Sequence, residues 1–417
     1  DFLSAIFPDA SRQLGPSFAL SSSVLGEDLF VISGTSNGSP ITPVGANNLV
    51  DLVTNAVNNE AQFTGLTGTD VSLSLNYGGV ADAVTITRNA AETQATLTFI
   101  TPNGTITRTF DTGTDPRSLE DQIRDYLQQN GADDLAEFFK AINALTPIAV
   151  SDGNPNATTA RMAELTFQRF GINNELTSVV VPDGDDSTRR ATPQLRINVS
   201  GSQFEAGDFE GDSATISTSF DANLGKSLGV SIASFLGYNS VEDADVFHFG
   251  VALGVPIRVI LPTAEAPFTW QVTPHASVAG SASEDIGAGG IIYSFGATSY
   301  FAWHATERLT LSMANQYAIY EGNKLSFGDY EIDPGVSQSI MKHGGRATFW
   351  LGVEWYSFAG VTYSDFIDDA AVDNWLTFTG GVGFKNDAGS GFELAVIADD
   401  GDDYSSFGLR LGANLAF

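Results

Sequence analysis

Residues 406–417 read SFGLRLGANLAF and alternate strictly between two kinds of side chain. The odd positions, from Phe407 to Phe417, are all apolar, whereas the even positions are small or polar. An apolar–polar period of two predicts a β-strand with two unlike faces. The chain therefore ends in a strand that places one face against an apolar environment.

The same alternation recurs through the second half of the sequence. Clear segments lie at 194–199, 215–224, 247–254, 309–319, 346–355 and 376–384, and weaker ones at 228–236, 268–278, 324–332, 358–366 and 391–398. The stretch 286–306 has no formally charged residue and is long enough for a helical span. Its glycines and its alternating apolar residues predict a strand there as well.

Two environments produce such a pattern: a soluble β-sandwich, and a membrane barrel whose apolar face meets lipid. Three features favour the barrel: the small residues on the polar face, the strand lengths, and the aromatic residues near strand ends. We expect a mainly β protein with a C-terminal antiparallel transmembrane β-barrel of about twelve strands, within roughly ten to fourteen. The barrel is assigned to 191–417, and an N-terminal α+β domain to 1–190.

The last residues carry a more specific resemblance. Arg410, Gly412, Leu415 and Phe417 fill the places of a polar residue, a glycine, an apolar residue and a terminal aromatic. This ending resembles the insertion signal of Gram-negative outer-membrane β-barrels, at the level of the class, porin-like or autotransporter-like. The resemblance implies that outer-membrane lipid and the barrel-assembly machinery are partners. It also implies an outer-membrane location after export.

The first half has a different pattern. Alternating residues in 71–111 predict a small antiparallel meander, with a hairpin turn at Pro102-Asn103-Gly104. Helical spacing follows in 119–127 and 135–145, where Asp115-Pro116 is the expected helix start. Shorter helices are predicted near 49–57 and 159–170, and a linker at 181–186. The amphipathic helices must pack on the meander, another subunit or the barrel interior, so the N-terminal domain can be a plug, a periplasmic domain or an assembly domain.

Composition excludes several classes of protein. With 19 Lys and Arg against 50 Asp and Glu, the formal charge is −31, so nucleic acid is not an expected partner. Cysteine is absent, which excludes disulfides and thiolate metal sites. The chain begins at Asp1 rather than Met, and we expect a signal peptide to have been removed from an exported protein.

The common metal- and phosphate-binding motifs are not found in the sequence. It has no HExxH, phosphate-loop or EF-hand pattern, so we expect neither an enzyme nor a cofactor. The acidic runs at 183–186, 368–369 and 399–403 fit solvated loops better than calcium sites, and no metal site is assigned. The alternation places His248 and His275 on the polar face, where they can meet in the lumen as hydrogen-bonding groups.

Charged residues on the polar face are the candidate functional set. Residues expected to line the lumen are Arg196, Asp221, His248, His275, Arg308, Arg346, Glu354, Glu393 and Arg410. Opposed arginine and carboxylate groups can create a transverse field across a pore, or can pair within a filled lumen.

Four functions follow from these patterns. The first is an outer-membrane barrel for porin-like passage of small solutes. The second is a structural or surface-assembly subunit, forming a lattice or filament, that uses the barrel as anchor or building block. In this second case the negative charge needs screening before copies can pack into a homo-oligomer. The third is an autotransporter-like translocator, and the fourth is a soluble β-sandwich binding module.

Overall fold

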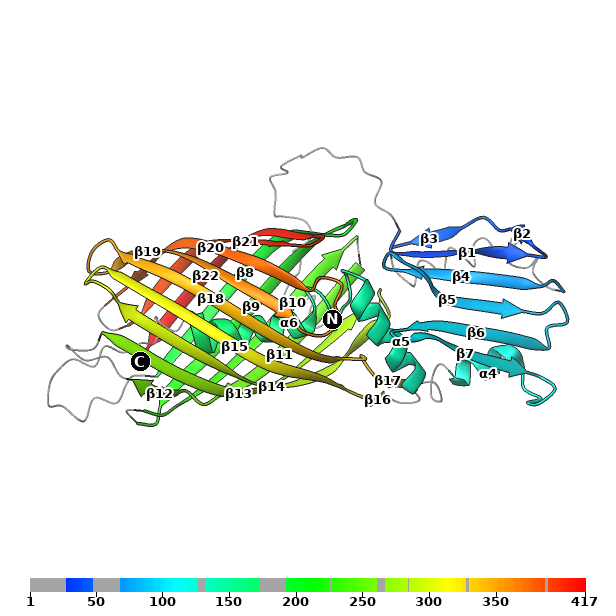
Figure 1. Cartoon of the computed structure of the whole chain (residues 1–417), viewed down its shortest axis with the longest axis horizontal. Coiled ribbons are helices and arrows are strands. Elements are labelled where there is room, and N and C mark those ends of the chain that lie inside the picture. The colour runs from blue at the N-terminus through cyan, green and yellow to red at the C-terminus, as the bar shows by residue number, and fades with distance from the viewer. Residues whose placement is uncertain are drawn as a thin grey trace.

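The computed structural model describes residues 28–47, 68–126, 132–172, 193–225, 227–242, 244–260, 267–283, 285–327, 330–386 and 389–417. Figure 1 shows two parts side by side along the longest axis: an N-terminal sheet and a larger C-terminal barrel. The C-terminus lies at the end of the barrel farthest from the N-terminal sheet.

Antiparallel strands joined in sequence order make up the barrel. Their bounds are β8 (Gln194–Ala206), β9 (Phe209–Asn223), β10 (Gly229–Val241), β11 (Ala244–Gly254), β12 (Ile257–Ile260), β13 (Phe268–Ser283), β14 (Ala288–His304), β15 (Leu309–Asn323), β18 (Ser337–Trp350), β19 (Trp355–Phe366), β20 (Asn374–Lys385), β21 (Gly391–Gly401) and β22 (Tyr404–Ala416). A small hairpin, β16 (Leu325–Phe327) and β17 (Tyr330–Ile332), lies in the connection between β15 and β18.

Two pairings turn the sheet into a closed barrel of twelve wall positions. Strand β22 pairs with β8 from Tyr404 opposite Ala206 to Ala416 opposite Gln194. Strands β11 and β12 pair with successive parts of β13 and so occupy one position in the wall, with Pro256 between them. The expected fold class, a closed antiparallel barrel of about twelve strands with an N-terminal α+β part, is confirmed.

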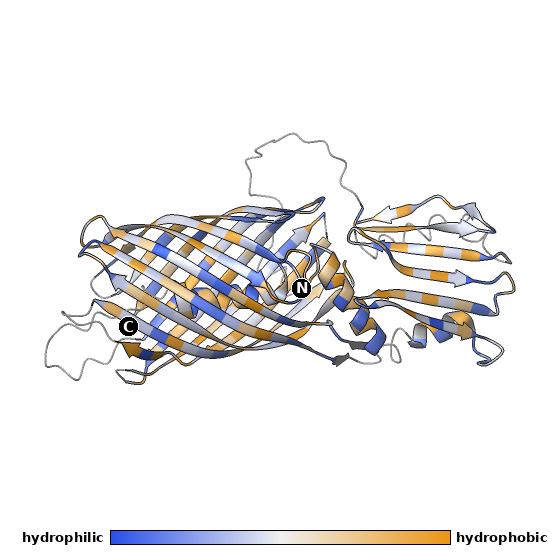
Figure 2. Ribbon diagram, in the orientation of Figure 1, coloured by the Kyte–Doolittle hydropathy of each residue, from blue (hydrophilic) through white to orange (hydrophobic). Residues whose placement is uncertain are grey.

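The outer surface of the barrel is apolar. On β22 the outward side chains Phe407, Leu409 and Leu411 are 62%, 56% and 54% exposed, whereas Arg410 between them is buried. Other strands repeat this arrangement, as the alternating hydropathy colours in Figure 2 show. A closed barrel with an apolar exterior satisfies all its ladder hydrogen bonds and suits a lipid environment.

The N-terminal part contains an open seven-stranded sheet, ordered β2-β1-β4-β5-β6-β7 with β3 beside β1. The bounds are β1 (Phe30–Ser36), β2 (Ser39–Pro40), β3 (Val44–Ala46), β4 (Val71–Tyr77), β5 (Val80–Arg88), β6 (Gln94–Thr101) and β7 (Gly104–Asp111). The meander expected in 71–111 is therefore confirmed. Its last turn lies where expected, with Gly104 at a φ of 129° that favours glycine.

Two helices accompany this sheet: α4 (Leu119–Asp125) and α5 (Ala132–Leu145). Helix α5 packs Phe138 against Phe99 and Tyr77, with ring centroids 5.6 and 6.1 Å apart. The predicted helix start at Asp115 is wrong, because the Ser118 side chain accepts the Asp121 N–H and caps α4 instead. The helix and linker predicted at 49–57 and 181–186 lie outside the described residues. None of the helices in the described part has the length and apolarity of a transmembrane helix.

The N-terminal part packs against one mouth of the barrel. Its buried cluster, which includes Phe30 and Tyr77, continues into Phe209, Val241 and Ile286 at the barrel rim. The Tyr77 hydroxyl donates to the Ile286 carbonyl at 2.9 Å. This mouth is formed by the turns that follow β8, β10 and β21, opposite to the end where β8 begins and β22 finishes.

The lipid-facing assignment predicts a depth-dependent effect of charge. Val396 is outward-facing at the centre of β21, so Val396→Arg should lower the free energy of unfolding by about 2–4 kcal/mol in vesicles. Leu224→Arg, just beyond the end of β9, should cost at most about 1 kcal/mol. Urea titration followed by heat-shifted gel mobility measures both, and equal effects would contradict the assignment.

Candidate functional site

A helix occupies the lumen of the barrel. Helix α6 (Thr158–Phe167) and the turn η2 (Gln168–Ile172) lie inside the ring of strands, as Figure 1 shows. The Gln316 amide on β15 donates to the Ala163 carbonyl at 3.3 Å and to the Thr166 hydroxyl at 2.8 Å. Of the three packing partners that the sequence allows for this helix, it uses the barrel interior.

Small residues in the wall make room for the helix. A Cβ on Gly344 would lie 2.9 Å from the Phe167 ring, and one on Gly254 would lie 2.9 Å from the Phe170 ring. Eight of the ten residues of α6 are buried, so the helix is enclosed on nearly every side. The glycine, alanine, serine and threonine of the inward faces therefore match a filled lumen rather than a wide aqueous channel.

Lumenal charges are arranged in ion pairs rather than across an open pore. Glu393 accepts from Arg346 at 2.9 Å and from Arg410 at 3.3 Å, and all three side chains are at most 7% exposed. Arg346 also lies over the Phe358 ring at 3.8 Å. All three charged groups have lost their hydration on burial. Moving one of them away would leave its partner buried without a compensating charge, so the geometry of the pairs is held in place.

Two further ion pairs lie inside the barrel. Arg196 on β8 lies 3.3 Å from Asp221 on β9. Lys342 on β18 donates to Glu164 of the lumen helix at 2.5 Å, and its ammonium group lies over the Trp375 ring. This second pair ties α6 directly to the wall.

Two predicted lumenal residues lie elsewhere. Arg308 and Glu354 are exposed in the turns before β15 and β19, at the end of the barrel that holds the C-terminus, so their assignment to the lumen is wrong. The alternation of apolar and polar residues continues past the ends of the strands into the turns. A turn has no side that faces the lumen, so the alternation no longer shows where these side chains point. The other seven predicted residues lie on the inner side of the wall.

His248 and His275 do not meet. His248 lies between the Thr158 hydroxyl and the Asn239 amide, at 3.0 and 3.1 Å. His275 faces Phe170, with ring centroids 5.5 Å apart. In the sheet register His275 pairs with Gly254, six residues along β11 from His248, which corresponds to roughly 20 Å.

The residues of the resembled C-terminal signal form part of β22 and its end. Leu415 and Phe417 point outward, at 46% and 67% exposed, and Arg410 points inward to Glu393. A Cβ on Gly412 would approach the Asn198 side-chain amide at 2.8 Å, so the space there is narrow. Their role in membrane insertion stays a prediction.

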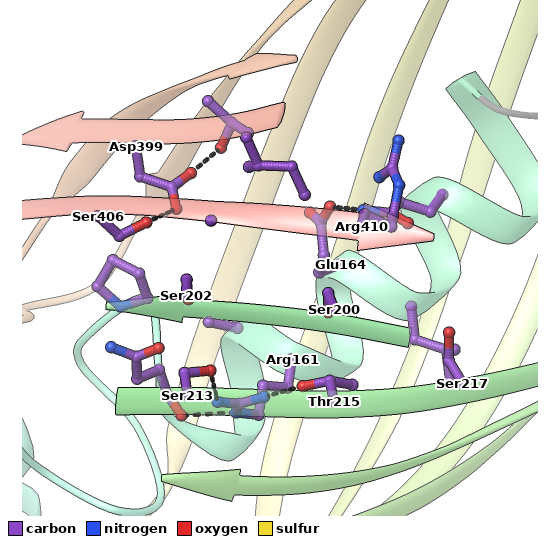
Figure 3. A pocket seen from close by; sticks show the side chains of 18 of the residues that line it. Arg161, Glu164, Ser200, Ser202, Ser213, Thr215, Ser217, Asp399, Ser406 and Arg410 are labelled. Atoms are coloured by element: carbon purple, nitrogen blue, oxygen red, sulfur yellow. Dashed lines mark hydrogen bonds between the residues drawn. The ribbon is translucent and has the colours of Figure 1, made fainter. Parts of the chain in front are cut away.

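A polar cavity of about 160 Å³ lies between the lumen helix and the wall. Figure 3 shows Arg161 with the hydroxyl groups of Ser213 and Thr215 beside it, and Arg410 and Asp399 on the neighbouring wall strands. Arg161 and Arg169 belong to this cavity and were missed by the sequence analysis, which searched for charge only in the barrel half. Their spacing of eight residues, close to two helical turns on 159–170, is the signal that could have shown them.

The segment that leads into the lumen carries one buried acid at the mouth. Asp152 accepts the Thr159 hydroxyl at 2.6 Å. Burial raises the pKa of Asp152 to about 7, against the hydrogen bonds from Thr159 and the Gly153 N–H, which lower it. This group is therefore not a fixed negative charge at neutral pH.

No family model matches the chain, and no curated protein matches it in sequence. Solved structures match it in fold. They include the translocator domain of the autotransporter NalP from Neisseria meningitidis, at 13% identity, with 62% of this chain and 97% of that chain covered and a TM-score of 0.41. The transport unit of the autotransporter AIDA-I from Escherichia coli matches at 14% identity, 59% and 96% coverage and a TM-score of 0.37. A FadL homologue from Pseudomonas aeruginosa matches at 8% identity, 54% and 90% coverage and a TM-score of 0.33. We draw no function from these likenesses.

The shared carboxylate predicts a large effect of one substitution. Glu393→Gln leaves the charges of Arg346 and Arg410 buried without their partner, and should lower the free energy of unfolding by about 3–5 kcal/mol. Glu354→Gln, in an exposed turn, is the matched control and should change it by less than about 0.5 kcal/mol. Urea unfolding in detergent compares the two, and a stable E393Q variant would show that the pairs carry no structural role.

Proposed function

We propose that this protein is an outer-membrane barrel whose lumen is closed by its own helix α6. The barrel holds the N-terminal sheet domain at one mouth, and the first and last strand ends, at Gln194 and Ala416, lie at the other mouth. One observation carries the proposal: the chain enters the lumen from the N-terminal domain, and the barrel begins at the other end. The Val372 N–H donates to the Gly153 carbonyl at the first mouth. Pro193, beside Phe417, lies at the second.

Contacts at the mouth support a fixed display of the domain. The Asn143 amide of α5 donates to the Pro334 carbonyl, just before β18, at 3.1 Å. The Thr146 hydroxyl donates to the Gly78 carbonyl at 2.6 Å and so holds the N-terminal sheet to the end of α5. An ion pair joins Lys324 and Asp133 across the same junction. The junction between the N-terminal domain and the barrel combines apolar packing with these polar contacts. It therefore favours a domain in a fixed position over one attached by a flexible linker.

The displayed sheet has one face rich in hydroxyl groups. In register across β5, β6 and β7, one row is Thr85, Thr98 and Thr107, and the next is Thr87, Thr96 and Thr109. The opposite face packs on α5. A regular polar face and open sheet edges give a surface on which copies or other molecules can assemble, which supports the structural or surface-assembly function.

Porin-like passage, the first function expected from the sequence, needs a clear lumen. Helix α6 fills that space, and the ion pair between Lys342 and Glu164 holds it there. Passage of solutes would therefore require the helix to leave the barrel. The filled lumen favours anchoring over passive transport.

An autotransporter-like function is the second candidate, and the same connection through the lumen supports it. In an outer-membrane barrel inserted from the side of its own termini, the N-terminal domain must cross the membrane to reach the other mouth. Passage of that domain through the barrel, followed by arrest with α6 inside, would produce this arrangement. Anchoring is then the final state of a translocation step.

The plug predicts low conductance. In a planar bilayer the full chain should give no large stable steps, because α6 and its ion pair fill the lumen. Ala163→Pro breaks this helix at a cost of about 3 kcal/mol and should produce frequent openings. Ala136→Pro breaks α5, which lies outside the lumen, and should leave the conductance as low as that of the unmodified chain.

Large stable conductance steps from the unmodified chain would contradict the proposal that α6 closes the lumen. They would favour the porin-like function instead. Equal openings from both proline variants would mean that the effect comes from a loosened N-terminal domain rather than from the lumen helix.

A further inference from the structure

The lumenal cavity beside α6 has more cations than its carboxylates can pair. Its lining includes Arg161, Arg169, Lys342 and Arg410, against Glu164 and Asp399. Lys342 pairs with Glu164, and Arg410 shares Glu393 with Arg346. Asp399 accepts hydroxyl groups from Thr377 and Ser406 rather than a cation. Within the described part of the chain, Arg161 and Arg169 are thus left without a carboxylate partner.

The partners that these two arginines do have are neutral. Arg161 donates to Ser213, Thr215, Asn239 and the Asn156 carbonyl. The Nη2 atom of Arg169 donates to the carbonyl and hydroxyl oxygens of Ser217, at 3.3 and 2.8 Å. Neutral acceptors satisfy hydrogen bonds, but they do not cancel a buried positive charge.

Arg169 has donors to spare. The side chain is only 4% exposed, and its Nε and Nη1 atoms have no hydrogen-bond partner among the described residues. It lies within electrostatic range of two other cations, Arg196 and Arg410, as well as of Asp221 and Glu393. A buried guanidinium group with unused donors beside like charges favours a bound anion.

The wall that the two arginines contact carries hydroxyl groups. Ser200 and Ser202 on β8 and Ser213, Thr215 and Ser217 on β9 line the cavity from one side, and Figure 3 shows them near Arg161. Alternate residues of a strand share a face, so these hydroxyls form two adjacent rows. Hydroxyl donors and planar guanidinium forks match the oxygen atoms of phosphate, sulfate and carboxylate groups.

We propose that this cavity binds a small oxyanion beside Arg161 and Arg169 of the lumen segment, with the serine and threonine hydroxyls of β8 and β9 that line the cavity as further donors. The volume of about 160 Å³ corresponds to roughly five water molecules, which accommodates a small oxyanion. The bound anion supplies the missing negative charge and links the lumen segment to the first two strands of the barrel. The site is independent of whether the barrel anchors or translocates.

Calorimetric titration of the full chain in detergent tests this site. Sodium phosphate, sodium sulfate and sodium acetate are titrated separately into a chloride buffer of matched ionic strength. We expect saturable binding of at least one of the three, near one per chain. Arg169→Gln should weaken it by about tenfold or more, since a charge-assisted hydrogen-bond pair is lost. The affinity of Arg169→Lys should lie between those of the unmodified chain and R169Q, because lysine keeps the positive charge but lacks the paired donors of the guanidinium group.

Two controls make the result decisive. Arg108→Gln, in an exposed ion pair of the N-terminal sheet, should leave binding unchanged. Heat-shifted gel mobility shows whether each variant folds, and if R169Q does not, Ser200→Ala with Ser217→Ala should still weaken binding in a folded barrel. No saturable binding of any of the three oxyanions, or unchanged affinity in a folded variant, would overturn the proposal.

Discussion

The pairing of β8 with β22 closes the barrel around a segment that precedes both strands in the chain. Once Gln194 lies opposite Ala416, α6 cannot leave the lumen sideways, and the N-terminal sheet stays at the mouth through which the chain enters. The filled lumen, the apolar exterior and the docking of Tyr77 on the barrel rim all depend on this closure. An open sheet would leave two long edges and a buried helix with one unsupported side.

Charge is distributed in the opposite sense inside and outside the molecule. The chain as a whole carries −31, yet the lumenal cavity is lined by four cations and two carboxylates. The exposed carboxylates face water, where their influence is screened over about 8–10 Å. The interior must therefore balance its own charge locally. Asp221, Glu164 and Glu393 do so for Arg196, Lys342, Arg346 and Arg410, and this need explains why these wall cations are paired rather than opposed across a channel.

Much of the barrel could be predicted because a strand with one lipid-facing side leaves a period of two in the sequence. The pattern placed Arg346, Glu393 and Arg410 on one face. Arg410 and Glu393 lie on neighbouring strands, but Arg346 reaches Glu393 from β18, with β19 and β20 between them, so strand order alone does not show that pair. It failed at Arg308 and Glu354, since alternation does not show where a strand ends. It could not locate α6 in the lumen, because an amphipathic helix shows only that it needs a partner. The spacing of Arg161 and Arg169 is visible in the sequence, but the wall that they contact is not.

The central claim is that the N-terminal sheet and the termini of the barrel lie on opposite sides of the membrane. The chain has no cysteine, so single cysteines can report each side: Thr105→Cys in the sheet, and Gly352→Cys in the turn between β18 and β19. Intact cells are labelled with a bulky, membrane-impermeant maleimide before and after the outer membrane is permeabilised. The account predicts that one of the two positions is labelled in intact cells and the other only after permeabilisation. Labelling of both positions from the same side would contradict it.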